Sequence, residues 1–405
     1  MDNLFIGYAV DRELSLKLPA VSAAGNNFQL GFIEAWKKRD NLKVASVIPM
    51  GTWPATPKIL VSKKRVEYRM KSGYKIIPYF NIKILKELTI AISIAKYIKK
   101  ICKGKNGREV NIITYNGNGP LSLPVLWLRK RYHYQYICLV VDPPLYQGTT
   151  IRTSAIWKLL YKSLKSSFMR AVAQCDVCVV LNKYFAEEYL HRKDYYVLDC
   201  GVDIGDLYQY EQETEEVCFW KKDDNLHLVF TGILHEHSGI LRFIDMFQKL
   251  RIPGMVLHVF GKGIYEKQIE QIAANDPIVE YHGFIKNSMI RTIQKQADLL
   301  VCPNTIEHPI NKVAFPSKIQ EYMLSGVPVL ATTVNGLGTE YYDYIYPYND
   351  TLTDLSRVLS EILADGVEKR LQKAKLAREF IVKEKNWDAQ IDKFLKHLEK
   401  KGNEN

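Results

Sequence analysis

The chain has 405 residues, of which 47% are hydrophobic and 25% charged. This length is enough for two or three packed domains, and the hydrophobic content is too high for a disordered protein. No apolar run approaches the ~20 residues of a membrane span, and the first twelve residues lack the basic start of a signal peptide, so we expect neither an integral membrane protein nor a secreted one. The net charge of +12 is uneven: residues 1–200 hold 32 basic and 14 acidic side chains, which predicts an anionic partner for this half. Seven scattered cysteines are typical of reduced side chains in the cytoplasm.

Short apolar runs rich in Val, Ile and Tyr alternate with helical patterns along the first half. We predict strands at 4–9, 43–49, 110–115, 136–141 and 177–181. Helices are predicted between them, at 28–39, 84–100, 121–131 and 156–173. Buried strands separated by amphipathic helices are typical of a parallel sheet with helices on both faces.

The same pattern restarts after residue 200. Strands are predicted at 226–231, 256–260, 279–282, 299–302 and 327–331. The matching helices are 240–250, 267–273, 288–295, 317–324 and 352–363, followed by a helical tail at 372–401 with a cap at Asn386. We therefore expect an α/β fold of two doubly wound, Rossmann-like domains facing a central cleft, with ligands beyond the carboxyl ends of the strands.

The domain boundary is predicted in the acidic, weakly periodic segment 199–225. The expected domains are residues 1–203 and 204–385, with a C-terminal helix in 386–405 that packs back on the first domain.

The segment 314–336, AFPSKIQEYMLSGVPVLATTVNG, carries the clearest chemistry. Phe315 and Pro316 interrupt the chain, and Ser317 is predicted to cap a helix whose first turn holds Lys318 and Glu321. A helix N-terminus attracts phosphate, Lys318 adds a positive charge, and Glu321 can accept two hydrogen bonds from a ribose diol. From spacing alone, an ordinary capped surface helix remains the alternative.

Residues 226–345 resemble the nucleotide-binding half of a GT-B glycosyltransferase of family 4, the glycosyltransferase group 1 type of polysaccharide assembly. The matching pieces, in the family's order, are LVFTGIL (228–234), LHVFGKG (257–263), VEYHGFI (279–285), QADLLVCPN (296–304) and FPSKIQEYMLSGVPVLAT (315–332). The resemblance implies a retaining hexosyltransferase that uses a UDP- or GDP-sugar as substrate, with no cofactor and no metal.

The resemblance also implies a donor site. Its residues would be Gly232, Gly263, Phe284, Pro316, Ser317, Lys318 and Glu321. Glu321 matches the family's ribose-binding glutamate. Lys318 and the helix N–H groups would stabilise the leaving diphosphate, which gives Lys318 a catalytic role.

Three positions depart from the family. Val313 stands where the first glutamate of a Glu-x7-Glu pair commonly touches the transferred sugar, which leaves the sugar open. Glu307, upstream in the same loop, is a candidate replacement. Ile233 and Ser238 stand where many members carry an Arg and a Lys for the diphosphate. His235 and His237, which lie between them, are candidate helpers.

The first half resembles the family more weakly. Gly25, Asn26 and Asn27 are predicted in a glycine-rich loop facing the donor phosphates and the acceptor, the alternative being an ordinary helix capped by Asn27. Asp142 follows the apolar run YICLVV, where a carboxylate needs a partner or a function. We take Asp142 as a catalytic candidate, along with Asn118 for acceptor contacts, and a strand-end turn residue is the alternative for Asp142.

The basic charge is concentrated in helical patterns at 82–105 and 151–171, where lysines are interleaved with apolar residues. This suits an anionic membrane surface, although solvated lysines on ordinary helices are the alternative. Together with the resemblance, it predicts a cytoplasmic enzyme, peripheral on the inner membrane face, acting on a glycan or a polyprenyl-diphosphate-linked acceptor. A nucleotide-sugar epimerase or phosphorylase on the same fold is the alternative function. A nucleic-acid-binding protein is a weaker one, and no nucleic acid is expected as a partner.

Overall fold

The computed structural model describes residues 2–62, 73–83, 85–105, 109–142, 155–203, 205, 218–221 and 223–403. The chain divides into two compact units. The first contains Met1–Gly201 and Gln390–Asn405, and the second contains Val202–Ala389.

The first unit is built on a seven-stranded parallel sheet. Its strands are β1 (Asp2–Gly7), β2 (Leu42–Ser46), β4 (Tyr74–Ile76), β6 (Val110–Tyr115), β7 (Gln135–Val140), β8 (Val177–Val180) and β9 (Tyr196–Val197). Their order across the sheet is β4-β2-β1-β6-β7-β8-β9. A short antiparallel pair, β3 (Leu60–Val61) and β5 (Tyr79–Phe80), lies outside this sheet.

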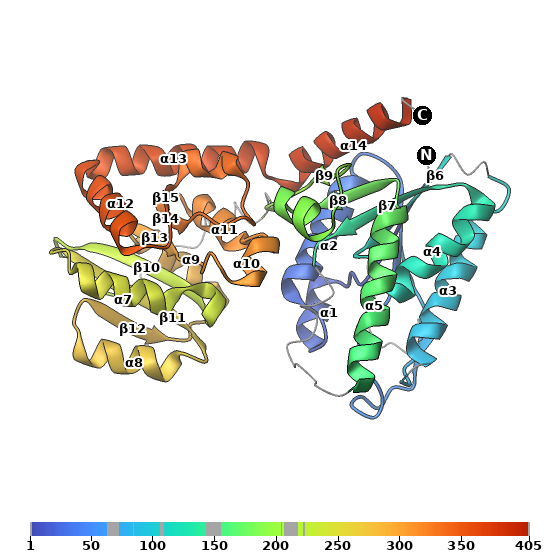
Figure 1. Ribbon diagram of the computed structural model, residues 1–405, viewed down its shortest axis with the longest axis horizontal. Coiled ribbons are helices and arrows are strands. Elements are labelled where there is room, and N and C mark those ends of the chain that lie inside the picture. The colour runs from blue at the N-terminus through green and yellow to red at the C-terminus, as the bar shows by residue number, and fades with distance from the viewer. Residues whose placement is uncertain are drawn as a thin grey trace. The chain divides into compact units, whose positions relative to one another are not determined.

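Helices cover both faces of this sheet, which explains why its central strands are buried almost throughout. The helices are α1 (Arg12–Lys17), α2 (Ala23–Lys37), α3 (Leu85–Cys102), α4 (Gly119–Tyr132) and α5 (Ala155–Gln174), with a π-helical turn η3 (Phe185–Tyr189). Figure 1 shows α3, α4 and α5 side by side, and they contact one another in that order. The crossover from β1 to β2 runs in the opposite direction, so α2 lies on the other face.

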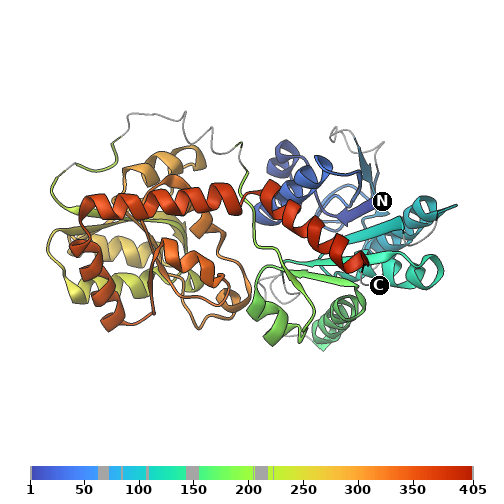
Figure 2. The ribbon, with the colours of Figure 1, turned by 90° about the horizontal axis from the view of Figure 1, so that it is seen from above.

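The last helix, α14 (Trp387–Asn403), completes the first unit from Gln390 onward. Figure 2 shows this helix, in red, running along the first unit. Its Phe394 ring lies 6.0 Å from that of Trp36 on α2 and 5.0 Å from that of Tyr196 on β9. Asn386 caps this helix, because its Oδ1 accepts a 2.8 Å bond from the N–H of Ala389.

The second unit contains a six-stranded parallel sheet. Its strands are β10 (Leu226–Leu234), β11 (Met255–Gly263), β12 (Val279–Gly283), β13 (Leu299–Cys302), β14 (Val329–Thr332) and β15 (Tyr346–Tyr348). The order is β12-β11-β10-β13-β14-β15, which leaves β12 and β15 at the edges.

Seven helices surround this sheet within the part of the chain that the structure describes. They are α7 (Ile240–Leu250), α8 (Glu266–Asn275), α9 (Asn287–Gln296), α10 (Pro309–Val313), α11 (Ser317–Ser325), α12 (Leu352–Ala364) and α13 (Gly366–Glu384). Two 3₁₀ turns, η4 (Glu236–Ser238) and η5 (Thr339–Tyr344), join them. The main apolar core lies between the sheet and helices α7, α8 and α12.

The predicted α/β class with two doubly wound sheets is confirmed, and most strands begin and end within three residues of their predicted bounds. The predicted start of the helix at 28–39 is wrong. The helix begins at Ala23, because the Ser22 hydroxyl accepts a 3.2 Å bond from the N–H of Gly25 and caps it. Gly25, Asn26 and Asn27 are therefore helical, neither a glycine-rich loop nor a cap at Asn27.

The predicted helix cap at Ser317 is also wrong, and part of the basic segment 151–171 is not described by the structure. Ser317 does not cap α11: it is the first helical residue, and Pro316 holds the cap position without a side-chain bond. Residues 151–154 of the basic segment 151–171 lie outside the described residues, as do the side chains of 155–161. None of the helices described here is long and apolar enough to cross a membrane.

Candidate functional site

Glycines stand where the carboxyl ends of β10 and β11 pair with each other. A Cβ on Gly261 would lie 1.8 Å from the carbonyl oxygen of Gly232, and the φ of Gly261 is 149°, so both space and backbone conformation require glycine there. A Cβ on Gly263 would lie 2.3 Å from the carbonyl oxygen of Leu234. Because Gly232 and Gly261 have no side chains, the backbone of these strand ends is open to close approach by a ligand.

Lys318 extends over this bare backbone from the first turn of α11. Its Cε would lie 3.6 Å from a Cβ on Gly232. Its Nζ lies 5.7 Å from the ring centre of Tyr322, and no ion pair to a carboxylate is found for it among the residues that the structure describes. The arrangement therefore offers a positive charge at the end of β10, next to a helix N-terminus.

Glu321 is oriented by a buried amide. Gln294 on α9, which is fully buried, donates a 2.7 Å bond from Nε2 to Glu321 Oε1 and lies 3.4 Å from Thr231 Oγ1. The hydroxyl of Tyr322 accepts a 3.0 Å bond from the N–H of Thr231, which ties α11 to β10. Glu321 is thus a half-buried, fixed carboxylate that can accept further hydrogen bonds.

Sequence reasoning missed Gln294. It stands 27 positions before Glu321, on a different helix, in a polar stretch with no distinguishing pattern. Only the packing of α9 against α11 brings the two side chains together.

Three imidazoles gather at the turn after β10. The rings of His235 and His237 are 5.1 Å apart, and the ring of His308, at the start of α10, is 5.8 Å from that of His237. Burial, reinforced by the two neighbouring imidazoles, lowers the pKa of His237. A neutral imidazole can donate one hydrogen bond to a phosphate without adding a full charge.

The positions that depart from the family have structural explanations. The Ser238 hydroxyl donates a 2.7 Å bond to the carbonyl oxygen of His235 and so stabilises the turn. Ile233 is exposed, and Val313 is buried at the end of α10. Glu307 is highly exposed and forms a 2.6 Å ion pair with Lys312. Neither Ile233 nor Ser238 supplies a cation, so Lys318 is the cation placed over β10.

Phe284 follows β12 directly and leaves 58% of its surface exposed. The Nζ of Lys262, at the end of β11, lies 4.4 Å from the centre of its ring. An exposed aromatic face beside a cation suits stacking on a planar ring.

Among the candidate residues at the start of α2, Asn26 has a structural role, whereas Asn27 is exposed and Gly25 lies close to β6. Both polar atoms of the Asn26 side chain bond the backbone of Val10, each at 2.9 Å, so Asn26 has a structural role. Asn27 is exposed. A Cβ on Gly25 would lie 2.8 Å from the hydroxyl oxygen of Tyr115, which places the start of α2 against the carboxyl end of β6.

Asp142 lies just after the neighbouring strand, β7. The Oδ1 of Asn116 accepts bonds from the N–H of Val141, at 2.8 Å, and of Asp142, at 3.1 Å, so the turn is fixed. Burial raises the pKa of the Asp142 carboxyl. Burial first and then the charge of Asp142 raise the pKa of Tyr115. The structure thus brings Gly25, Tyr115 and Asp142 to one end of the sheet, each within the first unit.

Comparisons with known proteins concern the second unit's domain and the fold of the chain. Residues 225–365 match the family model described as glycosyl transferases group 1. No curated protein sequence matches the chain.

Solved structures match over the whole chain at low identity. A glycosyltransferase from Rickettsia africae has a TM-score of 0.63 and 15% identity, covering 99% of this chain and 98% of its own. HepE from Anabaena, in complex with UDP, has a TM-score of 0.61 and 13% identity, covering 99% and 100%. A trehalose-6-phosphate synthase, described in terms of glycosyl transfer with retention, has a TM-score of 0.64 and 10% identity, covering 98% and 99%. The second unit therefore carries a glycosyl transferases group 1 domain, and the chain has the GT-B fold of glycosyltransferases.

Proposed function

We propose that this protein is a retaining glycosyltransferase of family 4 that moves a hexose from a nucleoside-diphosphate donor to a glycan or polyprenyl-diphosphate-linked acceptor. The observation that carries the proposal is the first turn of α11, where Lys318 lies over the end of β10 and Gln294 fixes Glu321. The family match over residues 225–365 and the similarity to HepE, whose structure contains UDP, support it.

The second unit binds the donor in this proposal. The free oxygen of the Glu321 carboxylate accepts hydrogen bonds from the ribose diol, and the exposed ring of Phe284 stacks on the base. Lys318 and the start of α11, at Pro316 and Ser317, hold the diphosphate. UDP- and GDP-sugars both fit these contacts.

The chemical step is carried largely by electrostatics. The bond between the sugar C1 and the diphosphate oxygen breaks, and the acceptor oxygen bonds to C1 on the same face. The acceptor proton passes to the departing diphosphate oxygen. Lys318 stabilises the negative charge that develops there. Transfer with retention, as in the similar trehalose-6-phosphate synthase, then needs no nucleophile from the protein.

The first unit binds the acceptor in this proposal. Asp142, half-buried beside Tyr115, aligns an acceptor hydroxyl. Gly25 allows the start of α2 to approach the same sheet end.

One exposed stripe of α3 supports a membrane-facing role at the cytoplasmic surface, in surface polysaccharide assembly. The stripe consists of exposed residues three or four apart: Leu85, Leu88, Ile92, Lys96 and Lys99 of α3, followed by Lys103 just beyond the end of the helix. Its first half is apolar and its second half is basic. Such surfaces bind anionic lipid by burying apolar side chains in the membrane and by attracting the negatively charged headgroups.

The test is an assay of transfer with two readouts. The protein is incubated with UDP- and GDP-sugars and with phosphatidylglycerol vesicles that carry a polyprenyl-diphosphate-linked monosaccharide. We expect a product one hexose heavier by mass spectrometry, with the donor's anomeric configuration by NMR. An inverted product would refute retention. Conversion of the nucleotide sugar itself, with no product on the lipid, would favour the epimerase or phosphorylase reading.

A further inference from the structure

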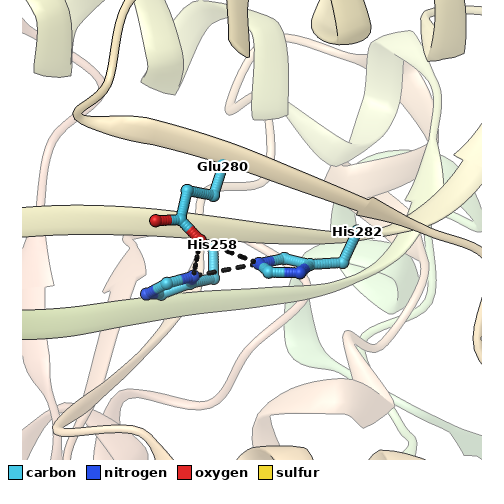
Figure 3. Close-up of side chains that lie close together, drawn as sticks. All are labelled: His258, Glu280 and His282. Carbon is cyan, nitrogen blue, oxygen red and sulfur yellow. Dashed lines mark hydrogen bonds and ion pairs between the residues drawn. The ribbon is translucent and has the colours of Figure 1, made fainter. Parts of the chain in front are cut away.

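Two histidines and a glutamate converge at the open edge of the second unit's sheet. His258 lies on β11, and Glu280 and His282 lie on the edge strand β12 (Figure 3). His258 is directly opposite Glu280 in the strand pairing, and His282 is two residues further along β12. All three side chains therefore lie on one face of the sheet. Their face is opposite the one that α7 and α8 cover, since the alternate residues Leu257 and Val279 belong to that core.

The three ligand-type atoms form a nearly regular triangle. The Nδ1 of His258 is 3.0 Å from the Nε2 of His282 and 3.3 Å from the Oε2 of Glu280, and the remaining side of the triangle is 3.5 Å. Zinc binds nitrogen and oxygen ligands at roughly 2.0–2.2 Å, so neighbouring ligands of a tetrahedral ion lie about 3.3–3.6 Å apart. Two sides of the triangle have the dimensions of one face of such a tetrahedron, and the 3.0 Å side between the two imidazole nitrogens is slightly shorter.

The next layer of contacts orients His258. Its Nε2 lies 2.8 Å from the Nδ1 of His227 on β10, and the Nε2 of His227 lies 3.1 Å from the Oδ1 of Asp223. An ionised carboxylate can only accept, so a neutral His227 donates from Nε2 and accepts at Nδ1, and His258 donates from Nε2. The ring of Trp220 stacks on His258 with centroids 4.3 Å apart and fixes its plane.

This relay leaves a lone pair on the Nδ1 of His258, facing the Glu280 carboxylate. Burial, followed by the neighbouring imidazoles of His282 and His227, lowers the pKa of His258 to about 3, and burial also lowers that of His282. The Nε2 of His282 and the Oε2 of Glu280 lie next to that lone pair, so three atoms of the kind that bind metal ions meet at one point. A cation at their centre would satisfy all three.

We propose that His258, Glu280 and His282 bind one divalent transition-metal ion of the zinc class. His227 and Asp223 are its supporting shell, a carboxylate–histidine relay that is common behind metal-bound imidazoles. The ion joins the edge strand β12 to β11, and three protein ligands leave at least one position for water. The site involves none of the residues assigned to the donor nucleotide, so it stands independently of the proposed transferase activity.

The test uses the full-length protein without a histidine tag, freed of metal by a chelator. Zinc is titrated in competition with a chromophoric chelator, and cobalt is titrated by its visible absorption. We expect one ion per chain. Glu280→Gln and His282→Gln should each weaken binding at least tenfold, and His227→Gln should weaken it about 10–100-fold.

The matched control is the double variant His235→Gln/His237→Gln, which alters the other histidine cluster of this unit. It should keep the full stoichiometry and affinity. Far-ultraviolet circular dichroism of each metal-free variant establishes that the fold is intact. Absence of stoichiometric binding in the wild type would overturn the proposal, leaving a hydrogen-bonded histidine relay. The proposal would also be overturned if Glu280→Gln and His282→Gln each bound zinc as tightly as the wild type. Loss of zinc binding in the control variant alone would overturn it too.

Discussion

Removing the carboxylate of Glu321 should weaken nucleoside-diphosphate binding through the ribose alone. Gln294 occupies one oxygen of Glu321 at 2.7 Å, so the other is the oxygen available to a ligand. A hydrogen bond to a charged acceptor contributes about 1.5–3 kcal/mol. Because 1.4 kcal/mol is a factor of ten, Glu321→Ala should raise the Kd for UDP or GDP by roughly 10–150-fold.

The same variant removes the 2.7 Å hydrogen bond from the buried Gln294 amide to a charged acceptor, which should lower the stability as well, by about 1.5–3 kcal/mol. Glu321→Gln separates the two effects. Its amide oxygen can still accept from Gln294, so the stability should be largely retained while the charged acceptor for the ribose is lost. Chemical denaturation of both variants measures this difference.

A double-mutant cycle with the ligand locates the contact. Calorimetry gives the Kd of the wild type and of Glu321→Gln for a ribonucleoside diphosphate and for its 2′-deoxy analogue. The deoxy analogue should bind the wild type more weakly, and most of that penalty should vanish in the variant, because interacting groups are not additive. Glu270→Gln, on the exposed face of α8, is the matched control and should bind like the wild type.

If removal of the 2′-hydroxyl weakened binding equally in the wild type and in Glu321→Gln, Glu321 would not contact the ribose, whatever its effect on affinity.

The remaining predictions concern Lys318, Asp142 and the lysines at the end of α3. Lys318→Ala should weaken nucleoside-diphosphate binding by about 1.5–3 kcal/mol and leave binding of the bare nucleoside unchanged in calorimetry; equal losses for both ligands would contradict a diphosphate contact. Asp142→Asn should spare nucleotide affinity and lower kcat by about 100-fold or more. Because burial raises the pKa of Asp142, the charged form is disfavoured in the folded state. The variant should therefore have the higher free energy of unfolding at neutral pH, with the difference vanishing below about pH 4 in denaturant titrations; the opposite trend would contradict the assignment. Reversing Lys96, Lys99 and Lys103 to Glu should weaken binding to phosphatidylglycerol vesicles by about 100-fold or more, at about 1 kcal/mol per lysine, and nucleotide affinity should stay the same. Unchanged vesicle sedimentation would place the lipid contact on another surface.

Much of the fold could be predicted because the signals were local. Apolar runs such as 299–302 and the helix at 240–250 agree with the observed elements to the residue. The start of α2 could not be read in this way, because Ser22, Asn26 and Asn27 are all acceptable caps by type. Ser22 is the residue that caps α2, whereas the side chain of Asn26 bonds both backbone polar groups of Val10, 16 residues earlier.

The site shows the same division. The first turn of α11 was visible in the sequence, since Lys318 and Glu321 follow a chain-breaking proline at a spacing that a helix brings together. Gln294, which orients Glu321, was invisible because the contact joins two helices. His258 and the pair Glu280 and His282 lie more than 20 residues apart, and only the register of β11 with β12 places them opposite each other.

We expect the second unit to bind a nucleoside diphosphate at Lys318 and Glu321. The measurement is titration of the wild-type protein with UDP, GDP, ADP and TDP in a calorimeter. We expect one binding site per chain, selective for UDP or GDP, and a clear loss of affinity in Glu321→Gln. Absence of binding for every nucleotide in the panel would contradict it, as would binding that is identical in the wild type and in this variant.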